Sequence, residues 1–156
     1  MLKIFTKKQD VRKKFNIDQE SIQDEIINLE YLESFNFSKT FKKLKRKLKN
    51  KTVVIYGTGA FFQVIKKHFD ISDINIIGIS DKKFEEHKEG EEFLGYKVYA
   101  PSELRGLNPD YVLVATKMYL SIIEDLYYDT LKDTNIKIKP LLKKDFITLV
   151  KEIWAL

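Results

Sequence analysis

The chain has 156 residues, of which 44% are hydrophobic and 13% aromatic, a composition typical of a globular protein rather than a disordered one. It contains no run of about 18 apolar residues that could cross a bilayer, and its N-terminal sequence has no apolar stretch typical of a secretory signal. It also contains no cysteine, which excludes disulfides and thiolate metal sites, so we expect a cytoplasmic protein.

The formal net charge of +5 is unevenly distributed along the chain. Residues 1–50 contain 13 Lys and Arg against 7 Asp and Glu, whereas residues 51–156 contain 15 against 16. We therefore expect two parts, a basic helical arm over residues 1–50 and a nearly neutral domain over residues 51–156. The near-neutral domain argues against nucleic acid as the partner of the whole chain.

Two amphipathic helices are expected in the arm. The first carries apolar residues at helical spacing, namely Ile22, Ile26, Leu29 and Leu32. The second, over residues 38–49 with Ser38 as its cap, carries an apolar stripe among its lysines, namely Phe37, Phe41, Leu44 and Leu48. We expect this stripe to pack on the domain or on a second subunit, which would make a homo-oligomer or a partner enzyme plausible. Peripheral contact with an anionic membrane and binding of nucleic-acid phosphates are the alternatives.

From Thr52 onward, β-branched runs alternate with helical patterns. In chain order we expect a strand at 52–55, a helix at 60–69, a strand at 74–80, a charged loop at 82–95, a short strand at 97–100, a short helix from Pro101, a strand at 111–115, a helix at 118–131, a weak strand at 136–138 and a helix at 143–154. This alternation predicts βαβ units and an α/β fold, a Rossmann-like doubly wound parallel sheet of about five strands behind the arm.

The sharpest motif is the pair of glycines that follows the first strand. Gly57 would allow a tight turn, and Gly59 would let backbone N–H groups approach a phosphate at the start of the next helix. Asp81 ends the second strand, where an acidic group can accept hydrogen bonds from a ribose diol. The full dinucleotide fingerprint requires a third small residue, but Phe62 stands there. A phenylalanine at this position predicts a displaced helix or a ring turned into the cleft.

Two segments carry a family resemblance. VVIYGTGAFFQVIKKHF (53–69) and INIIGISDKKFEEHKEGEEFLGYKVYAPSELRGLNPDYVLVAT (74–116) resemble the Rossmann-like nucleotide-binding domain of bacterial surface-polysaccharide and nucleotide-sugar biosynthesis proteins. That domain precedes the β-helix of sugar acyltransferases, and it also occurs in polysaccharide epimerase/dehydratases and beside sugar methyltransferases. The resemblance covers roughly residues 52–117, and the chain has neither the hexapeptide β-helix repeat nor a second catalytic domain.

The resemblance implies a ligand site at the carboxyl ends of the strands. It implies Gly57, Thr58, Gly59 and Ala60 at a phosphate, Asp81 at a ribose or other diol, and Thr116 beside the ligand. It thereby implies a nucleotide or nucleotide-sugar binding module in bacterial polysaccharide biosynthesis. The alternatives are a small NAD(P)-dependent sugar-modifying oxidoreductase completed by a partner subunit, and an interaction protein that has lost the ligand. The sequence identifies neither the cofactor nor a catalytic residue, and we expect no metal site.

Two other patterns offer chemistry but have simpler explanations. Tyr128 and Lys132 have the Tyr-x-x-x-Lys spacing of short-chain dehydrogenases, but they fall near the helix end that should lie far from the ligand edge. His87 lies in a loop rich in glutamate, which could attract a hard cation or form a lid. We expect a surface pair in the first case and a solvated loop in the second.

Overall fold

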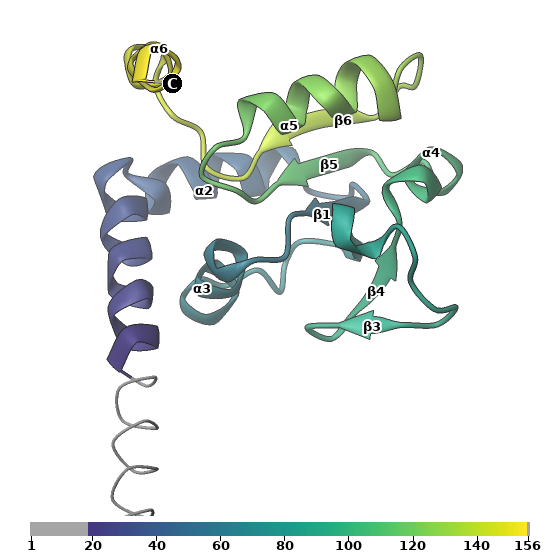
Figure 1. Ribbon diagram of the computed structural model, residues 1–156, viewed down its shortest axis with the longest axis horizontal. Helices are drawn as coiled ribbons and strands as arrows, with labels where there is room; N and C mark the ends of the chain where they lie inside the picture. Colours follow the sequence, from purple (N-terminus) through teal and green to yellow (C-terminus); the bar gives the residue numbers. More distant parts are fainter. Residues whose placement is uncertain (1–18, 156) are drawn as a thin grey trace, which may run out of the picture.

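A computed structural model describes residues 19–155, so residues 1–18 of the predicted arm lie outside the described part of the chain. The fold is built on one six-stranded sheet with the strand order β3-β4-β2-β1-β5-β6 (Figure 1). Every neighbouring pair is parallel except β3 and β4. The prediction of an α/β fold with a mainly parallel sheet is therefore confirmed.

The strands and helices alternate along the chain as the hydrophobic pattern predicts. The strands are β1 (Val53–Tyr56), β2 (Ile76–Ser80), β3 (Glu92–Phe93), β4 (Tyr96–Tyr99), β5 (Tyr111–Val114) and β6 (Lys137–Pro140). The helices are α2 (Phe37–Lys47), α3 (Ala60–His68), α4 (Leu104–Leu107), α5 (Leu120–Asp125) and α6 (Phe146–Ala155), and a helix described over residues 19–34 precedes them. None of the described helices is both long enough and apolar enough to cross a membrane.

Helices cover both faces of the sheet, which explains why β1 and β5 are buried along their whole length. On one face, Val53 and Ile55 pack against α2 and α3 in the larger hydrophobic cluster. On the other, Val54 packs with Leu104 of α4 and with Leu126, the residue that follows α5. In Figure 1, α5 lies at the top beside β6, and α3 lies lower, at about the height of β4 and to its left.

The apolar stripe of the basic helix is packed against this core. Phe37, Phe41 and Leu48 are no more than 3% exposed, and they belong to the same cluster as the residues of β1 and α3. Phe37 also meets Phe69 edge to face, with ring centroids 4.8 Å apart. The expectation that the stripe packs on the domain is confirmed. The helix begins at Phe37, and its N-cap residue is Asn36, two positions before the expected cap Ser38.

The segment 82–95 is more ordered than the solvated loop we expected. It contains a 3-10 turn over Lys82–Phe84 and the strand β3, which forms a hairpin with β4. Phe84 is buried and meets Phe93, and the His87 side chain contacts Glu103 at 2.6 Å. The hydrogen bond to the Lys88 carbonyl, followed by Glu103, raises the pKa of His87 above its ordinary value. These contacts hold the segment against the domain.

The helix expected over residues 118–131 is interrupted. α5 ends at Asp125 and continues as a π-helical turn over Leu126–Thr130. A π-helical turn contains more residues than an α-helical turn, so the side chains after it face a different direction. The prediction that Tyr127 lies on the buried, apolar side of this helix is therefore wrong, since Tyr127 is 63% exposed. Leu126 is buried as predicted.

Candidate functional site

The strand order reverses between β1 and β5. From β1 the chain proceeds through β2 to β4 on one side of the sheet, and β5 and β6 then extend it on the other side. Open α/β sheets bind ligands in the crevice at the carboxyl ends of the strands where this reversal occurs. The arrowheads of β5 and β6 in Figure 1 point toward the side where α6 and the helix 19–34 lie. The predicted site residues all fall at this edge.

Gly57 forms the tight turn that the sequence predicts. Its φ angle is +102°, a conformation that L side chains rarely adopt, and its N–H donates to the Ser80 carbonyl at 2.9 Å. A Cβ atom added there would lie 2.9 Å from Cγ2 of Thr116 and 3.3 Å from the Ala115 carbonyl oxygen. The structure thus brings Gly57 and Thr116 together, and Gly57 is required by backbone conformation and by space.

Replacing Gly57 by alanine should lower the free energy of unfolding by about 1–3 kcal/mol, the usual cost of a strained left-handed conformation. Gly59→Ala is the matched control two residues away. Gly59 has a φ of −77°, and no atom lies within 4 Å of an added Cβ, so its replacement should change stability by less than about 1 kcal/mol. Urea denaturation of both variants measures the difference, and equal losses would contradict this assignment.

Asp81 holds the glycine turn. Its Oδ2 accepts hydrogen bonds from the Thr58 backbone N–H at 3.0 Å and from the Thr58 hydroxyl at 3.1 Å. Its Oδ1 accepts only a longer bond from the Lys83 N–H, at 3.3 Å. The Asp81 carboxylate therefore already accepts a bond from the Thr58 N–H, one of the N–H groups that we expected to bind a phosphate. The role of Asp81 toward a ribose stays a prediction, for which Oδ1 is the available oxygen.

The start of α3 remains open beyond this turn. Gly59 is the N-cap residue of α3; it makes no side-chain capping bond, and the first turn contains no acidic residue. Both Gly59 and Ala60 are exposed, whereas Thr58 is fully buried. Helix N-termini carry unsatisfied N–H groups and a partial positive charge, so this turn can accept an anion at Gly59 and Ala60.

Phe62 does not enter the cleft. The side chain is fully buried in the larger hydrophobic cluster, with Ile55 of β1 and Ile79 of β2. A small residue at this position of the fingerprint permits close contact between helix and strand. Here a ring fills that space instead, and the expectation of a ring turned into the cleft is wrong. The glycine corner is not blocked by this aromatic side chain.

Two buried hydroxyls at the same edge have no hydrogen-bond partner among the described residues: Ser80 Oγ and Thr116 Oγ1. Ser80 is the last residue of β2 and lies opposite Tyr56, the last residue of β1. Burial and then the nearby carboxylates of Asp81, Glu85 and Asp125 raise the pKa of Tyr56 to about 12, so its hydroxyl stays protonated. The sequence motif does not mark Ser80 or Tyr56, although each directly precedes a predicted site residue at a strand end.

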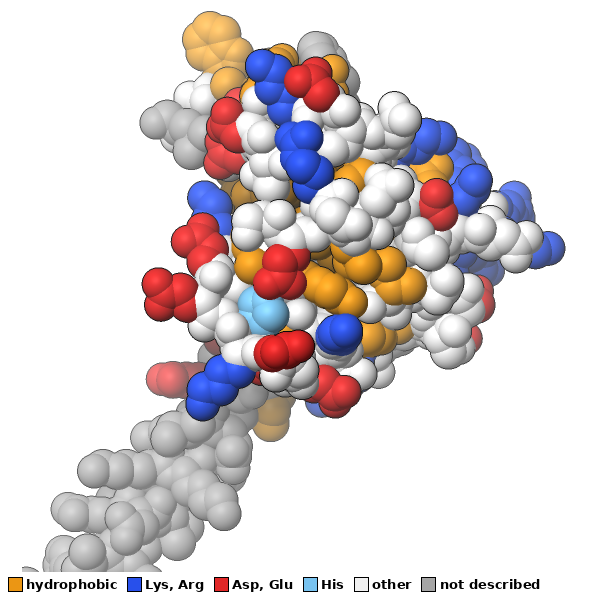
Figure 2. Space-filling view, turned by 90° about the vertical axis from the view of Figure 1, so that its right-hand side faces the viewer, with side chains coloured by type: hydrophobic (Ala, Val, Ile, Leu, Met, Phe, Trp, Pro, Cys, Tyr) orange, Lys and Arg blue, Asp and Glu red, His pale blue; other side chains and the backbone are white. Residues whose placement is uncertain are grey.

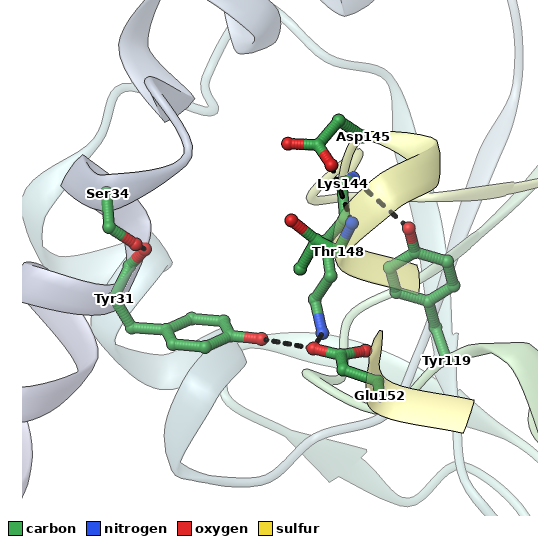
Figure 3. Close-up of polar contacts among 7 residues, drawn as sticks. All are labelled: Tyr31, Ser34, Tyr119, Lys144, Asp145, Thr148 and Glu152. Atoms are coloured by element: carbon green, nitrogen blue, oxygen red, sulfur yellow. Dashed lines mark hydrogen bonds and ion pairs between the residues drawn. The ribbon is translucent and has the colours of Figure 1, made fainter. Parts of the chain in front are cut away.

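A second polar cluster lies near the ends of β5 and β6 (Figure 3). The ammonium group of Lys144 is fully buried and lies 2.5 Å from Oε1 of Glu152 on α6. It also lies over the rings of Tyr31, Phe35 and Tyr119, between 5.3 and 5.8 Å from their centroids. We name these five residues the Lys144 cluster. Its members come from the helix 19–34 and the turn after it, from the segment after β5, and from the C-terminal segment, so the cluster joins all three parts of the chain.

Electrostatics in the Lys144 cluster favour the charged lysine. Burial alone would lower the pKa of Lys144, but the Glu152 carboxylate and the Tyr31 hydroxyl outweigh burial and raise it. Tyr119 accepts a hydrogen bond from the Lys144 backbone N–H at 3.1 Å, and burial raises the pKa of Tyr119. A nucleophilic lysine needs a lowered pKa. The charged Lys144 therefore fits a role in holding these segments together, not in nucleophilic catalysis.

Tyr31 links this cluster to the glycine edge. Its ring lies 6.2 Å from Phe61 in the first turn of α3, and the Lys117 ammonium group lies 4.9 Å above it. Lys117 directly follows Thr116 at the end of β5. The helix 19–34 therefore borders the predicted ligand edge.

The remaining candidates lie elsewhere. Tyr128 is 66% exposed and Lys132 is also exposed, as expected of a surface pair. His68 pairs with Glu25 of the helix 19–34, and His87 pairs with Glu103. The described residues contain no group of three or more His, Cys, Asp or Glu side chains placed to hold a metal ion.

Comparisons with known proteins add one finding. No curated protein matches the chain significantly. A family model described as C2185-like, N-terminal, matches residues 49–139, which span the sheet from β1 to the middle of β6 and include the whole glycine edge. Since this match covers more than half of the chain, the protein belongs to the C2185-like family through this N-terminal-type domain.

Proposed function

We propose that the protein is a nucleotide or nucleotide-sugar binding module with a Rossmann-like, doubly wound sheet. The ligand would lie at the carboxyl ends of β1, β2 and β5. A phosphate group would bind the N–H groups of Gly59 and Ala60, and a ribose hydroxyl would donate to Oδ1 of Asp81. The unpartnered hydroxyl of Thr116 would supply a further polar contact at the end of β5.

The observation that carries this proposal is the open N-terminus of α3 at the reversal of strand order. The turn before α3 is fixed by the Asp81–Thr58 hydrogen bonds, while space remains around Gly59. A rigid turn with exposed amides loses little entropy when an anion binds. The motifs shared with polysaccharide and nucleotide-sugar biosynthesis domains favour a nucleotide sugar in the bacterial cytoplasm, and NAD(P) is the alternative ligand.

Calorimetric titration with UDP-, CDP- and GDP-sugars, NAD(P) and CoA tests this function. We expect at least one nucleotide ligand to bind, and Gly59→Leu to weaken that binding at least tenfold because its side chain would occupy the open space. Gly106→Leu is the matched control, since Gly106 also has no atom within 4 Å of an added Cβ but lies in α4. If no ligand binds, or if both variants bind alike, the proposal fails.

A second candidate is an interaction protein without a nucleotide, favoured by the position of Asp81. The Asp81 carboxylate, accepting bonds from Thr58, places a negative charge beside the predicted phosphate position and would repel an anion. In that case the Asp81 bonds serve only to stabilise the turn. Calorimetric titration of the wild type distinguishes the candidates, because a ligand-binding protein should bind a nucleotide despite the Asp81 charge, whereas the interaction protein should bind none.

A further inference from the structure

A basic groove lies between α2 and the end of β6, apart from the glycine edge. It has a volume of about 410 Å³ and is lined by Thr40, Lys43, Leu44, Lys47, Lys139, Pro140, Leu141 and Lys143. That volume lies within the usual range for small-molecule sites. We propose that this groove binds a phosphorylated ligand carrying at least two negative charges. The proposal does not depend on nucleotide binding at Gly59.

Four ammonium groups supply the charge. Lys43 and Lys47 are one helical turn apart on α2 and form one wall, while Lys139 and Lys143 stand on the other side. No acidic residue lines the groove, and none of the four lysines takes part in an ion pair among residues 19–155. Four like charges around one hollow repel each other, and a multivalent anion would relieve that repulsion.

The hollow on the opposite flank of α2 provides a contrast. It is larger, about 700 Å³, and is also lined by basic side chains, but Asp73 is part of its wall. Lys45 there pairs with Asp73 at 3.2 Å and donates to the Asp70 carbonyl at 2.8 Å. The Lys45 side chain therefore attaches α2 to the domain. Within the described part of the chain, no acidic side chain pairs with the lysines of the groove at β6.

Apolar side chains also line the groove. Leu44, Pro140 and Leu141 are among its lining residues, and Leu141 is almost fully buried. A site that combines charged and apolar side chains suits a ligand whose phosphate groups meet the lysines while an organic part contacts carbon atoms. On the face drawn in Figure 2, a group of Lys and Arg side chains gathers at the upper right, while single basic and acidic side chains are scattered over the rest of that face.

The groove is built mainly from segments outside the family domain. The family match covers residues 49–139, so α2 lies before it and residues 140–143 lie after it. A simpler role exists for Lys139, because lysine and proline on an edge strand such as β6 prevent pairing with another sheet. That role does not explain Lys43 and Lys47, which lie on a helix across the groove.

Two charge-matched double variants test the proposal. Lys43→Gln/Lys47→Gln removes two charges from the groove, and Lys42→Gln/Lys49→Gln removes two charges from the larger hollow that contains Asp73. Both should be made in the Gly59→Leu background, so that the glycine edge contributes no binding. Calorimetric titration with inorganic pyrophosphate measures a soluble ligand. Co-sedimentation with phosphatidylcholine vesicles, with and without phosphatidic acid, measures a lipid headgroup.

We expect saturable binding in at least one of the two measurements. The Lys43/Lys47 variant should lose at least tenfold in affinity, while the Lys42/Lys49 variant should change less than threefold. Circular dichroism should show both variants to be folded, because all four side chains are exposed. Equal losses in the two variants would show that the charge of α2 acts diffusely, as in non-specific nucleic-acid binding, and would overturn the proposal. So would no binding of either probe.

Discussion

Phe62→Ala is expected to lower the free energy of unfolding by about 3–5 kcal/mol, the usual cost of removing a fully buried phenylalanine ring. Phe62 has no exposed surface and contacts residues of both α3 and the sheet in the larger hydrophobic cluster. Alanine would leave a cavity between helix and strands that the surrounding backbone cannot fill. Urea denaturation of the wild type and variant measures the loss.

Further substitutions of Phe62 test whether the third small residue of the dinucleotide motif could be accommodated at this position. Phe62→Gly would restore the third small residue of the dinucleotide motif, yet it should cost at least as much stability as alanine because glycine also disfavours a helix. Phe62→Leu, which keeps most of the volume, should cost much less. A Phe62→Gly protein as stable as the wild type would mean that helix and strand can approach more closely than the packing indicates.

Glu152→Ala is expected to lower the free energy of unfolding by about 2–3 kcal/mol. Removing Glu152 leaves the Lys144 ammonium group buried without a countercharge, which costs about 3–5 kcal/mol in a dry interior. We expect a loss of only about 2–3 kcal/mol because the Glu152 side chain is 24% exposed, so water can partly solvate the ion pair. Because the folded-state pKa of Lys144 is raised, the contribution should persist on the alkaline side up to pH 10.5, the ordinary lysine value, and be lost as pH rises further.

The control is the reverse substitution. Lys144→Met removes the buried charge and fills its place with an apolar side chain, so it should cost less than Glu152→Ala. Adding Glu152→Ala to the Lys144→Met protein should then have almost no further effect. A double-mutant cycle by chemical denaturation gives the coupling between the two residues. Additive losses would show that the ion pair does not stabilise the attachment of α6.

The central strands were predictable because both of their faces are buried. β1 and β5 consist of consecutive apolar residues, and the structure places them side by side in the middle of the sheet. The amphipathic stripe of α2 was predictable for a similar reason, since only one of its faces is apolar. The sequence also placed Gly57, Asp81 and Thr116 at strand ends, and the fold brings all three to one edge.

The hairpin of β3 and β4 was not predictable in the same way. Its turn residues, Leu94 and Gly95, have φ angles of +54° and +80°, which fit the type I′ turns that join short hairpins. Asparagine or aspartate usually precedes the glycine of such a turn, and leucine rarely adopts a positive φ. β3 also has only two residues, too few to show an alternating pattern.

The polar details of the site depend on tertiary contacts. The sequence predicts Asp81 at a ribose but does not show that the Thr58 N–H donates a hydrogen bond to its carboxylate. Nothing in the spacing of Tyr31, Tyr119, Lys144 and Glu152 predicts that they surround one another, because they come from three separate segments. Only the assembled sheet brings these segments together.

The contact between Tyr31 and Glu152 has a consequence for the order of folding. The two residues are 121 positions apart in sequence, so their contact can form only once the intervening sheet has assembled. We expect α6 to dock last during refolding and to detach before the strands open. In native-state hydrogen exchange, amides of α6 should therefore exchange through a partial opening well below the energy of global unfolding, whereas amides of β1 and β5 should exchange only with it.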